Sequence, residues 1–456
     1  GRERERERKT KKHSWIAVVL RMEREVASYE FAAEPFVLLN KQYSQQYSHL
    51  YFCRLAELRP LLTVVAKTQW PHAEFAERFT ELSQGKQVAV MGTVYKEMPL
   101  KPSVLDQIST ERFILPPPPR ENYISDEDSL ILEDESGRVD LTGESLAVSS
   151  FCTGTVVAFL GRMDNVGSFQ VDDYCLLGLA PQRPLPSPVS EHPRFVLLAS
   201  GLCIGSPDSN PGLCELLVDF VQGAVGEGED LALQKSICRV VLAGNNCCSP
   251  EKSAPSVDLK LVSSSKQQED IVSPLRELDV LLTQLGASTF VDVMPGKTDL
   301  SSYTLPQQAM SPSLLPYSSR LESIQLVTNP YSFSVDGVQF LGSSGQPLCD
   351  MSKYVGVEDR MQLLEKTLSW RHMAPTAPDT LGCYPFMESD PFIIRETPHV
   401  YFSGNEEAFQ SKTVHGPDDQ TCLLVLVPDF SKTGDVVLVD LHQQNASVLH
   451  FDSLLS

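Results

Sequence analysis

The pattern of apolar and polar residues divides the chain into a helical stretch, a strand-rich stretch and a stretch in which strands and helices alternate. Between residues 47 and 65 apolar side chains recur every three or four positions, which predicts an amphipathic helix. A second helix is expected over residues 73–82. Together they predict a small helical module over residues 35–84, whose apolar stripe packs on its own domain.

From residue 85 onward the apolar residues occur in short runs, which predicts strands rather than helices. The runs cover residues 88–95, 130–132, 139–141, 154–160 and 169–171. Turn residues between them are typical of hairpins. Short strands without a parallel-sheet pattern predict a small β-barrel of the OB type over residues 85–180. The prolines at 116–119 are expected to form a stiff loop between two of these strands.

The last part of the chain is predicted to be a layered sandwich. Prolines within residues 181–193 indicate a linker. The run Phe195–Leu202 begins with five apolar residues and then reaches small ones, which is typical of a strand buried on both faces. Strands and helices then alternate, so residues 194–456 are expected to form an α/β sandwich. The polar, serine-rich residues 249–266 are expected to form a mobile loop. The fold class expected for the whole chain is an α+β and α/β multidomain protein.

The first 34 residues differ from the rest of the chain. Gly1–Arg8 alternates arginine with glutamate, and the apolar piece Trp15–Leu20 is too short for a signal-peptide core. We expect residues 1–34 to be a disordered extension. Our hypothesis is that residues 1–21 lie upstream of the natural protein, and a basic nuclear-import tail is the alternative.

Composition and charge narrow the choice of partners. The net charge of −21 disfavours binding of duplex phosphates by the whole chain and favours a partner with a basic surface. Eleven cysteines without CxxC pairs indicate reduced thiols rather than a zinc site or a disulfide framework. No apolar run approaches the roughly 20 residues that span a bilayer.

The acidic hairpins of the predicted barrel bear on its function. OB barrels commonly bind single-stranded nucleic acid through basic grooves and stacking aromatic residues. The hairpins here carry Glu133, Asp134, Glu135, Asp140, Asp172 and Asp173. We therefore favour a barrel that binds proteins, and a single-stranded DNA-binding module remains the alternative.

Turns after the buried strands carry the candidate chemistry, because ligands of layered α/β domains bind at the carboxyl ends of strands. The order of these turns resembles the calcineurin-like metallophosphoesterase fold, which holds two metal ions there with aspartate and histidine. The corresponding positions in this chain are Ser200, Leu202, Asn245, Gly296, Asn405 and Glu407. These residues define a vestigial cleft that keeps the turns of that fold but lacks its ligands.

The charges of these six residues decide whether the cleft can bind metal. Two divalent ions ~4 Å apart repel each other by roughly 16 kcal/mol at an effective dielectric constant of ~20. Neutral serine and asparagine with one glutamate cannot offset this repulsion. We therefore expect no metal ion, no cofactor and no catalytic residue, and a phosphoesterase with an altered metal site is the enzyme alternative.

Five segments closely resemble the second (small, B) subunits of eukaryotic DNA polymerase delta. They are Val291–Gly296, Tyr303–Gln308, Val327–Tyr331, Pro375–Phe386 and Pro398–Asn405. The resemblance extends from about residue 35 to the C-terminus. It implies an OB domain joined to an inactive phosphoesterase domain in a nuclear, non-catalytic subunit of a DNA polymerase used in replication and repair. It also implies as partners the C-terminal domain of the catalytic subunit and a third subunit, and indirectly the sliding clamp and DNA.

The proline-rich, aromatic segment Pro375–Phe392 is a candidate interface, and we call it the aromatic loop. Aromatic side chains on a rigid loop make good anchors because they lose little entropy on docking. The anchors expected here are Tyr384, Phe386, Pro391 and Phe392. The alternative is that the loop packs on its own sheet.

Overall fold

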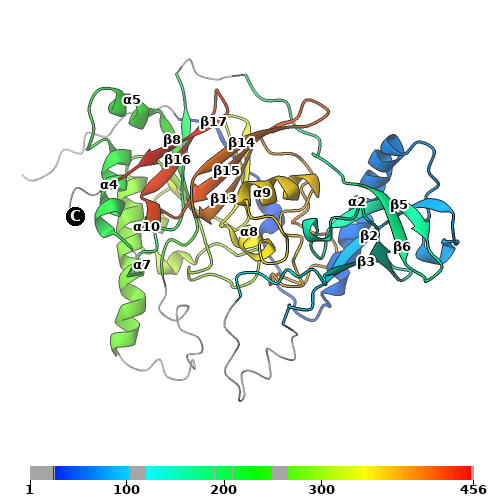
Figure 1. The fold of residues 1–456 in the computed structure, drawn as a ribbon. Helices are drawn as coiled ribbons and strands as arrows, with labels where there is room; N and C mark the ends of the chain where they lie inside the picture. Colours follow the sequence, from blue (N-terminus) through cyan, green and yellow to red (C-terminus); the bar gives the residue numbers. More distant parts are fainter. Residues whose placement is uncertain are drawn as a thin grey trace, which may run out of the picture.

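The computed structural model describes residues 24, 26–102, 120–187, 192–207, 209–248 and 265–452, and backbone alone for 265–271. A β-barrel lies at one end of the molecule and a sandwich of two sheets at the other (Figure 1). The predicted loop at 116–119, residues 1–23 of the predicted extension and most of the predicted loop at 249–266 lie outside the described residues. Among the residues described, no helix combines the length and apolarity needed to cross a membrane.

Helix α2 (Ser48–Gln69) confirms the predicted amphipathic helix. It packs on the barrel through a stripe of buried residues at helical spacing, Leu55, Leu58, Leu62 and Ala66. The second predicted helix, over residues 73–82, is wrong apart from the short 3-10 turn η2 (Phe79–Glu81). Instead, Ala76 donates its N–H to the carbonyl of Ala89 and Glu74 accepts from the Ala89 N–H, so this segment runs alongside a strand of the barrel.

The barrel confirms all five predicted strands and closes in the order β2-β3-β4-β6-β5. Their bounds are β2 Gln87–Glu97, β3 Ser129–Glu133, β4 Arg138–Thr142, β5 Val156–Met163 and β6 Phe169–Cys175. Alternate residues of each strand fill the interior, as the period-2 pattern requires. The interior includes Val90, Val94, Leu132, Val139, Phe159 and Phe169.

The sandwich contains two six-stranded sheets with helices on their outer faces. The first sheet has the order β10-β9-β8-β7-β16-β17, with β7 Phe195–Ala199, β8 Ile237–Ala243, β9 Phe290–Met294, β10 Ile324–Leu326, β16 Asp435–Asp440 and β17 Asn445–His450. The second has the order β1-β11-β12-β13-β15-β14, with β1 Tyr29–Phe31, β11 Tyr331–Val335, β12 Val338–Ser343, β13 Val400–Glu406, β14 Gln410–His415 and β15 Thr421–Pro428.

Two groups of helices cover these sheets. The first sheet is covered by α4 (Pro211–Gln222), α5 (Glu229–Ser236) and α7 (Ser265–Gly286), and α8 (Gln346–Met351) and α9 (Arg360–Ser369) lie on the side of the second sheet. Short helical turns are η1 (Glu34–Phe36), η3 (Val148–Ser150), η5 (Pro312–Leu314), η6 (Ser318–Arg320) and α10 (Phe430–Thr433). The predicted alternation of strands and helices is thereby confirmed in kind.

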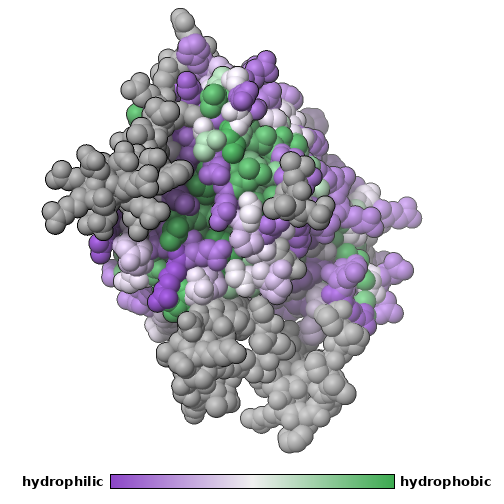
Figure 2. All heavy atoms as spheres, turned by 90° about the vertical axis from the view of Figure 1, so that its left-hand side faces the viewer, coloured by the Kyte–Doolittle hydropathy of each residue, from purple (hydrophilic) through white to green (hydrophobic). Residues whose placement is uncertain are grey.

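The face that carries α4, α5 and α7 has apolar side chains in its upper and central part, with polar side chains around them (Figure 2). Large apolar side chains exposed on these elements and the adjoining edge strand include Val272 and Val280 of α7 and Val448 of β17. We call this surface the helix-layer face. Contiguous exposed apolar surface on a globular protein commonly marks an interaction site.

Strand β1 corrects the predicted boundary of the N-terminal extension. Residues 29–31, which fall within the predicted disordered segment, pair antiparallel with β11, and Tyr29 lies opposite Val335. The hydroxyl groups of Tyr29 and Tyr331 are 2.8 Å apart, and the Arg239 guanidinium lies 3.6 Å from the centre of the Tyr29 ring. The reason is tertiary, because these partners lie far away in the sequence.

Arg54 of α2 joins the barrel to the sandwich. Its guanidinium is fully buried and donates to the carbonyl of Gly154 in the barrel and to those of Pro375 and Ala377 in the aromatic loop. Its Nε also lies 2.8 Å from a carboxylate oxygen of Asp390. The helix therefore holds the two larger units in one fixed arrangement.

Candidate functional site

The strand ends of the sandwich bring most of the predicted cleft residues together. Ser200 follows β7, Asn245 follows β8, Gly296 follows β9 and Asn405 lies near the end of β13. The Asn405 N–H donates to Ser200 Oγ at 2.8 Å. A Cβ atom placed on Gly296 would lie 2.5 Å from Asn245 Oδ1 and 2.8 Å from Ser344 Oγ, so these groups crowd a small space. We call Ser200, Asn245, Gly296, Ser344 and Asn405 the strand-end cleft.

The side chains of the cleft bind the backbone of neighbouring turns. Ser200 Oγ donates to the carbonyl of Pro428 at 3.0 Å. Asn405 Nδ2 donates to the carbonyl of Ser344 at 3.0 Å, and Asn245 Oδ1 accepts from the N–H of Thr298 at 3.2 Å. Each of these side chains therefore fixes a loop. Asn245 and Asn405 also have positive φ angles of 56° and 58°, a conformation that asparagine tolerates better than most residues.

Two residues of the predicted cleft lie elsewhere. Leu202 is 1% exposed and belongs to the core beneath the helix layer, where it packs as an apolar residue. Glu407 is exposed, whereas its neighbour Glu406 is buried and accepts from Ser403 Oγ at 2.8 Å. Burial raises the pKa of Glu406 to about 7. The pairing of β13 with β15 shifts register between Ser403 and Glu406, an irregularity that the sequence pattern did not reveal.

Two carboxylates near the cleft are absent from the residues predicted for it. Asp299 is fully buried and accepts from the N–H groups of Gly296 at 2.7 Å and Cys247 at 2.8 Å. Burial raises the pKa of this carboxyl, although its hydrogen bonds oppose the effect. Asp429 caps the short helix α10 through Ser431. The sequence contained a signal for each of these residues. Asp299 lies three residues after a Pro-Gly turn, and Asp429 lies just before a short helix.

The described residues offer no set of metal ligands. Within the described ranges, no three histidine, cysteine, aspartate or glutamate side chains are arranged so that they could hold a metal ion. The nearby carboxylates of Asp299 and Asp429 already bind backbone N–H groups. These two carboxylates therefore hold backbone turns in place, as the neutral side chains of the cleft do.

The aromatic loop packs largely on its own domain, which corrects part of the predicted interface. Phe392 is 0% exposed in the core of the sandwich, Pro391 and Tyr384 are buried, and Phe386 is half-buried. The rings form a series of edge-to-face contacts, at 6.2 Å between Phe386 and Phe392 and 5.0 Å between Tyr384 and Phe386. Phe392 is therefore a core residue, because its ring completes the packing under the second sheet.

The exposed end of this aromatic series comes from another part of the chain. Tyr43 lies edge-on to Tyr384 at 5.5 Å and is 68% exposed. On the loop itself, Met387 is 48% exposed, and its carbonyl accepts from the Cys53 thiol of α2. Exposed apolar groups beside the loop are therefore contributed by Tyr43 and Met387, neither of which was among the predicted anchors.

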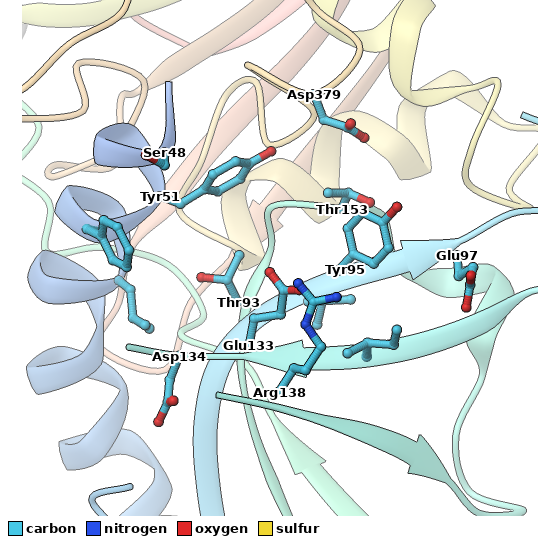
Figure 3. Close-up of a pocket in the computed structure, with 14 residues that line it drawn as sticks. Ser48, Tyr51, Thr93, Tyr95, Glu97, Glu133, Asp134, Arg138, Thr153 and Asp379 are labelled. Atoms are coloured by element: carbon cyan, nitrogen blue, oxygen red, sulfur yellow. The ribbon is translucent and has the colours of Figure 1, made fainter. Parts of the chain in front are cut away.

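A pocket lies on the outside of the barrel (Figure 3). This pocket of about 530 Å³ is bounded by α2, by the outer faces of β2 and β3, and by Asp379 of the aromatic loop. Its lining includes Tyr51, Phe52, Leu55, Thr93, Tyr95, Glu97, Ile131, Glu133, Asp134, Arg138 and Asp379. We call it the barrel-face pocket. No residue of the pocket was predicted as a site, although the acidic hairpin residues Glu133 and Asp134 were noted.

Comparison with known protein families assigns both larger units. The model of the DNA polymerase delta subunit OB-fold domain matches residues 46–174. The model of the DNA polymerase alpha/epsilon B subunit matches residues 196–411. These matches confirm the expected fold class, in which an OB barrel precedes a sheet-rich α/β domain.

Individual relatives are similar over nearly the whole chain. The DNA polymerase delta small subunit of Arabidopsis thaliana is 41% identical over 435 residues, which cover 95% of this chain and 98% of that protein. DNA polymerase delta subunit 2 of Drosophila melanogaster is 37% identical, and the match covers 93% of this chain and 97% of that protein. The small subunit of Saccharomyces cerevisiae is 33% identical, and the match covers 92% of both chains. The chain therefore belongs to the family of DNA polymerase delta small subunits.

Proposed function

We propose that the chain is a non-catalytic scaffold of a nuclear DNA polymerase delta. In this proposal it bridges the C-terminal domain of the catalytic subunit and a third subunit during DNA replication and repair, and through them it is connected with the sliding clamp and DNA. The observation that carries the scaffold role is the strand-end cleft. Its neutral side chains, Ser200, Asn245 and Asn405, each form a hydrogen bond with the backbone of a neighbouring turn.

Electrostatics supports a cleft without chemistry. A pair of divalent ions needs several anionic ligands to offset a mutual repulsion of roughly 16 kcal/mol. Asp299 and Asp429 lie close to these turns, and both accept hydrogen bonds from backbone N–H groups. The enzyme alternative, a phosphoesterase with an altered metal site, therefore has no ligand set among the described residues.

A bridging role also requires separate surfaces on one rigid body. The barrel and the helix-layer face lie at opposite ends of the molecule (Figure 1). The buried Arg54 contacts hold these ends in a fixed arrangement. Two partners could thus bind at the same time and be kept at a defined distance from each other.

Co-expression of the full chain with the catalytic and third subunits tests this proposal. We expect a stable complex of all three, in which omission of this chain separates the other two during gel filtration. A phosphodiester hydrolysis assay of the purified chain, combined with elemental analysis, is the second measurement. Turnover with stoichiometric manganese or iron, abolished by chelation, would refute the non-catalytic role.

A further inference from the structure

The strand register of the barrel places a row of apolar and polar side chains on its outer face. Tyr95 of β2 pairs with Ile131 of β3, and Thr93 pairs with Glu133. Residues next to them in sequence, such as Val94 and Leu132, fill the barrel interior, so the paired residues face outward. The barrel-face pocket, which lies mainly on β2 and β3, only partly overlaps the face that OB folds commonly use for oligonucleotides and oligosaccharides, which is formed by the second and third strands of the barrel. Here those strands are β3 and β4.

This outer face has an apolar floor and wall. Ile131 is only 9% exposed although it points away from the barrel core. From α2, Leu55 lies deep in the pocket, whereas Phe52 is 47% exposed at its edge. A hollow of about 530 Å³ bounded by such groups can hold a large apolar side chain from a partner.

The rim of the barrel-face pocket is acidic. Four carboxylates line it, from Glu97, Glu133, Asp134 and Asp379, against a single arginine, Arg138. Arg138 lies 2.9 Å from Glu133, and Arg59 of α2 lies 3.9 Å from Asp134. Lys101 lies 2.6 Å from Asp379, so three cations balance part of the four negative charges and the rim keeps a net negative charge. An acidic, low-dielectric hollow attracts cations and repels phosphate.

The surroundings of the pocket explain why a bound segment would matter for assembly. Its walls come from α2, the barrel and the aromatic loop, and Asp379 of that loop is bound by Lys101 at 2.6 Å. A ligand in the pocket would therefore touch all three parts of the chain. The ring of Tyr95 at the same site offers a face on which a guanidinium or ammonium group can stack, whereas the ring of Tyr51 already lies 5.3 Å from the guanidinium of Arg54.

We propose that the barrel-face pocket binds a protein segment in which an apolar side chain is flanked by lysine or arginine. The apolar side chain would enter between Phe52 and Ile131, and the cations would meet Glu97, Glu133 and Asp379. The inference rests on the proposed function in one respect, since the segment would belong to another subunit of the polymerase. It also excludes single-stranded DNA as the ligand of this barrel face.

A photo-crosslinking experiment on the assembled complex tests the identity of the bound segment. Phe52 is replaced by the photoreactive residue p-benzoylphenylalanine, and the crosslinked peptide is identified by mass spectrometry. Val166, which is 89% exposed in the β5–β6 turn, receives the same residue as a control. We expect position 52, but not position 166, to crosslink to a lysine- or arginine-bearing segment of another subunit. A crosslink to added oligonucleotide, to this chain's own residues 1–23, or to nothing in the intact complex would overturn the proposal.

A second experiment needs only the isolated full chain. Fluorescein-labelled peptides Lys-Lys-Leu-Phe-Lys-Lys and Glu-Glu-Leu-Phe-Glu-Glu are titrated against it by fluorescence anisotropy. The double variant Glu97→Lys with Glu133→Lys should weaken binding of the lysine peptide at least tenfold. The matched control, Glu121→Lys with Glu144→Lys, makes the same charge change at exposed residues outside the pocket and should retain the affinity.

The two experiments separate this inference from the proposed function. Equal binding of the lysine peptide by both double variants refutes the pocket, even if the three subunits still co-purify. If the subunits do not co-purify, the proposed function fails, and the peptide titration alone decides whether the pocket is a binding site. Circular dichroism spectra of the variants that match the unaltered chain establish that each is folded.

Discussion

At the carboxyl ends of the sandwich strands, Asn405 gives both hydrogens of its side-chain amide to backbone carbonyls, those of Ala243 and Ser344. An aspartate or a histidine at this position could bind a cation. The amide of Asn405 instead connects its own turn to the turns that contain Ala243 and Ser344. Ser200 acts similarly through the carbonyl of Pro428. At the level of single residues, the site is thus built for loop geometry.

Asn245 tests this interpretation. Replacement of Asn245 by alanine removes the hydrogen bond to Thr298 and places a Cβ-bearing residue without a polar side chain at a φ of 56°. We expect a loss of about 2 kcal/mol in the free energy of unfolding, from about 1 for the hydrogen bond and about 1 for the backbone. Polymerase activity of the assembled complex should stay within about twofold, because the proposed scaffold role assigns no chemistry to this residue.

Asn245→Gly is the matched control, since glycine adopts this backbone conformation without strain. It should lose only about 1 kcal/mol of unfolding free energy. A large fall in polymerase activity of Asn245→Ala complexes that remain fully assembled would contradict a purely structural role.

The pH dependence of stability reports on Glu406. Burial raises the pKa of Glu406 to about 7, from 4.5 for an ordinary glutamate, so the folded chain holds this proton more tightly than the unfolded chain. The corresponding stabilisation is present below pH 4.5 and is lost as the pH rises to about 7; it amounts to about 3 kcal/mol at most. Glu406→Gln should flatten this part of the curve of unfolding free energy against pH.

Urea denaturation of both proteins at several pH values between about 4.5 and about 8 measures the effect. Glu407→Gln is the control, because the neighbouring side chain is exposed. If the difference between the unaltered chain and Glu406→Gln does not change with pH, the carboxyl of Glu406 does not titrate in this range.

At the level of elements, the aromatic loop combines a buried and an exposed part. Phe392 packs in the core next to His372, with the ring centres 6.3 Å apart, whereas Met387 reaches the surface only five positions earlier. The same loop can therefore support the sandwich and offer apolar groups to a partner. Strand β1 also has a role at this level, because it extends the second sheet through its pairing with β11.

Charged substitutions in this loop should have opposite consequences. Phe392→Asp buries a charge without a partner and should lower the free energy of unfolding by more than about 3 kcal/mol. Met387→Asp leaves the charge in water and should change the unfolding free energy by less than about 1 kcal/mol. Thermal and urea unfolding measure both effects, and a pull-down of the catalytic subunit with the Met387→Asp variant then tests the exposed part as an interface. Equal stability of the two variants would show that Phe392 is not a core residue.

In the molecule as a whole, one buried cluster connects the helix, the barrel and the sandwich. Asp390 is bound by Arg54 and by His372, each at 2.8 Å. Although burial opposes it, these two neighbours lower the pKa of Asp390, which therefore stays ionised. Burial, together with Arg54, lowers the pKa of His372 to about 4, so the imidazole is neutral near pH 7 and binds Asp390 through a hydrogen bond.

Removal of the guanidinium should uncouple the units. Arg54→Met leaves Asp390 buried without its cation and frees the carbonyls of Gly154, Pro375 and Ala377, which should cost about 3–5 kcal/mol of unfolding free energy. Arg59→Met on the same helix removes a partly exposed pair with Glu135 and should cost less than about 1 kcal/mol. Urea denaturation followed by limited proteolysis between barrel and sandwich distinguishes the two. A small effect of Arg54→Met would show that the arrangement of the units does not depend on this cluster.

The elements and their class follow from the order of residues along the chain. Apolar residues at period 2 or about 3.6 are required wherever one side of a strand or helix is buried, so the five barrel strands, α2 and the alternating sandwich could be predicted from local pattern alone. The positions of the neutral residues at the strand ends could also be predicted, because glycines in the turns indicate where the strands end. The preference against nucleic acid at the acidic hairpins follows from charge, which needs no coordinates.

Which residues share a site depends instead on how the chain packs. Asp299 accepts hydrogen bonds from the N–H groups of Gly296 and Cys247, and Tyr29 pairs with a strand some 300 positions away in the sequence. The ring of Phe392 is buried in the core. All three outcomes depend on long-range contacts, which the local pattern of apolar residues does not encode. The barrel-face pocket likewise depends on long-range contacts, because residues of α2, of the barrel and of the aromatic loop line it together. Local pattern fixes which face of an element is apolar, but the partner that covers this face, or leaves it open, is set by the three-dimensional arrangement of the elements.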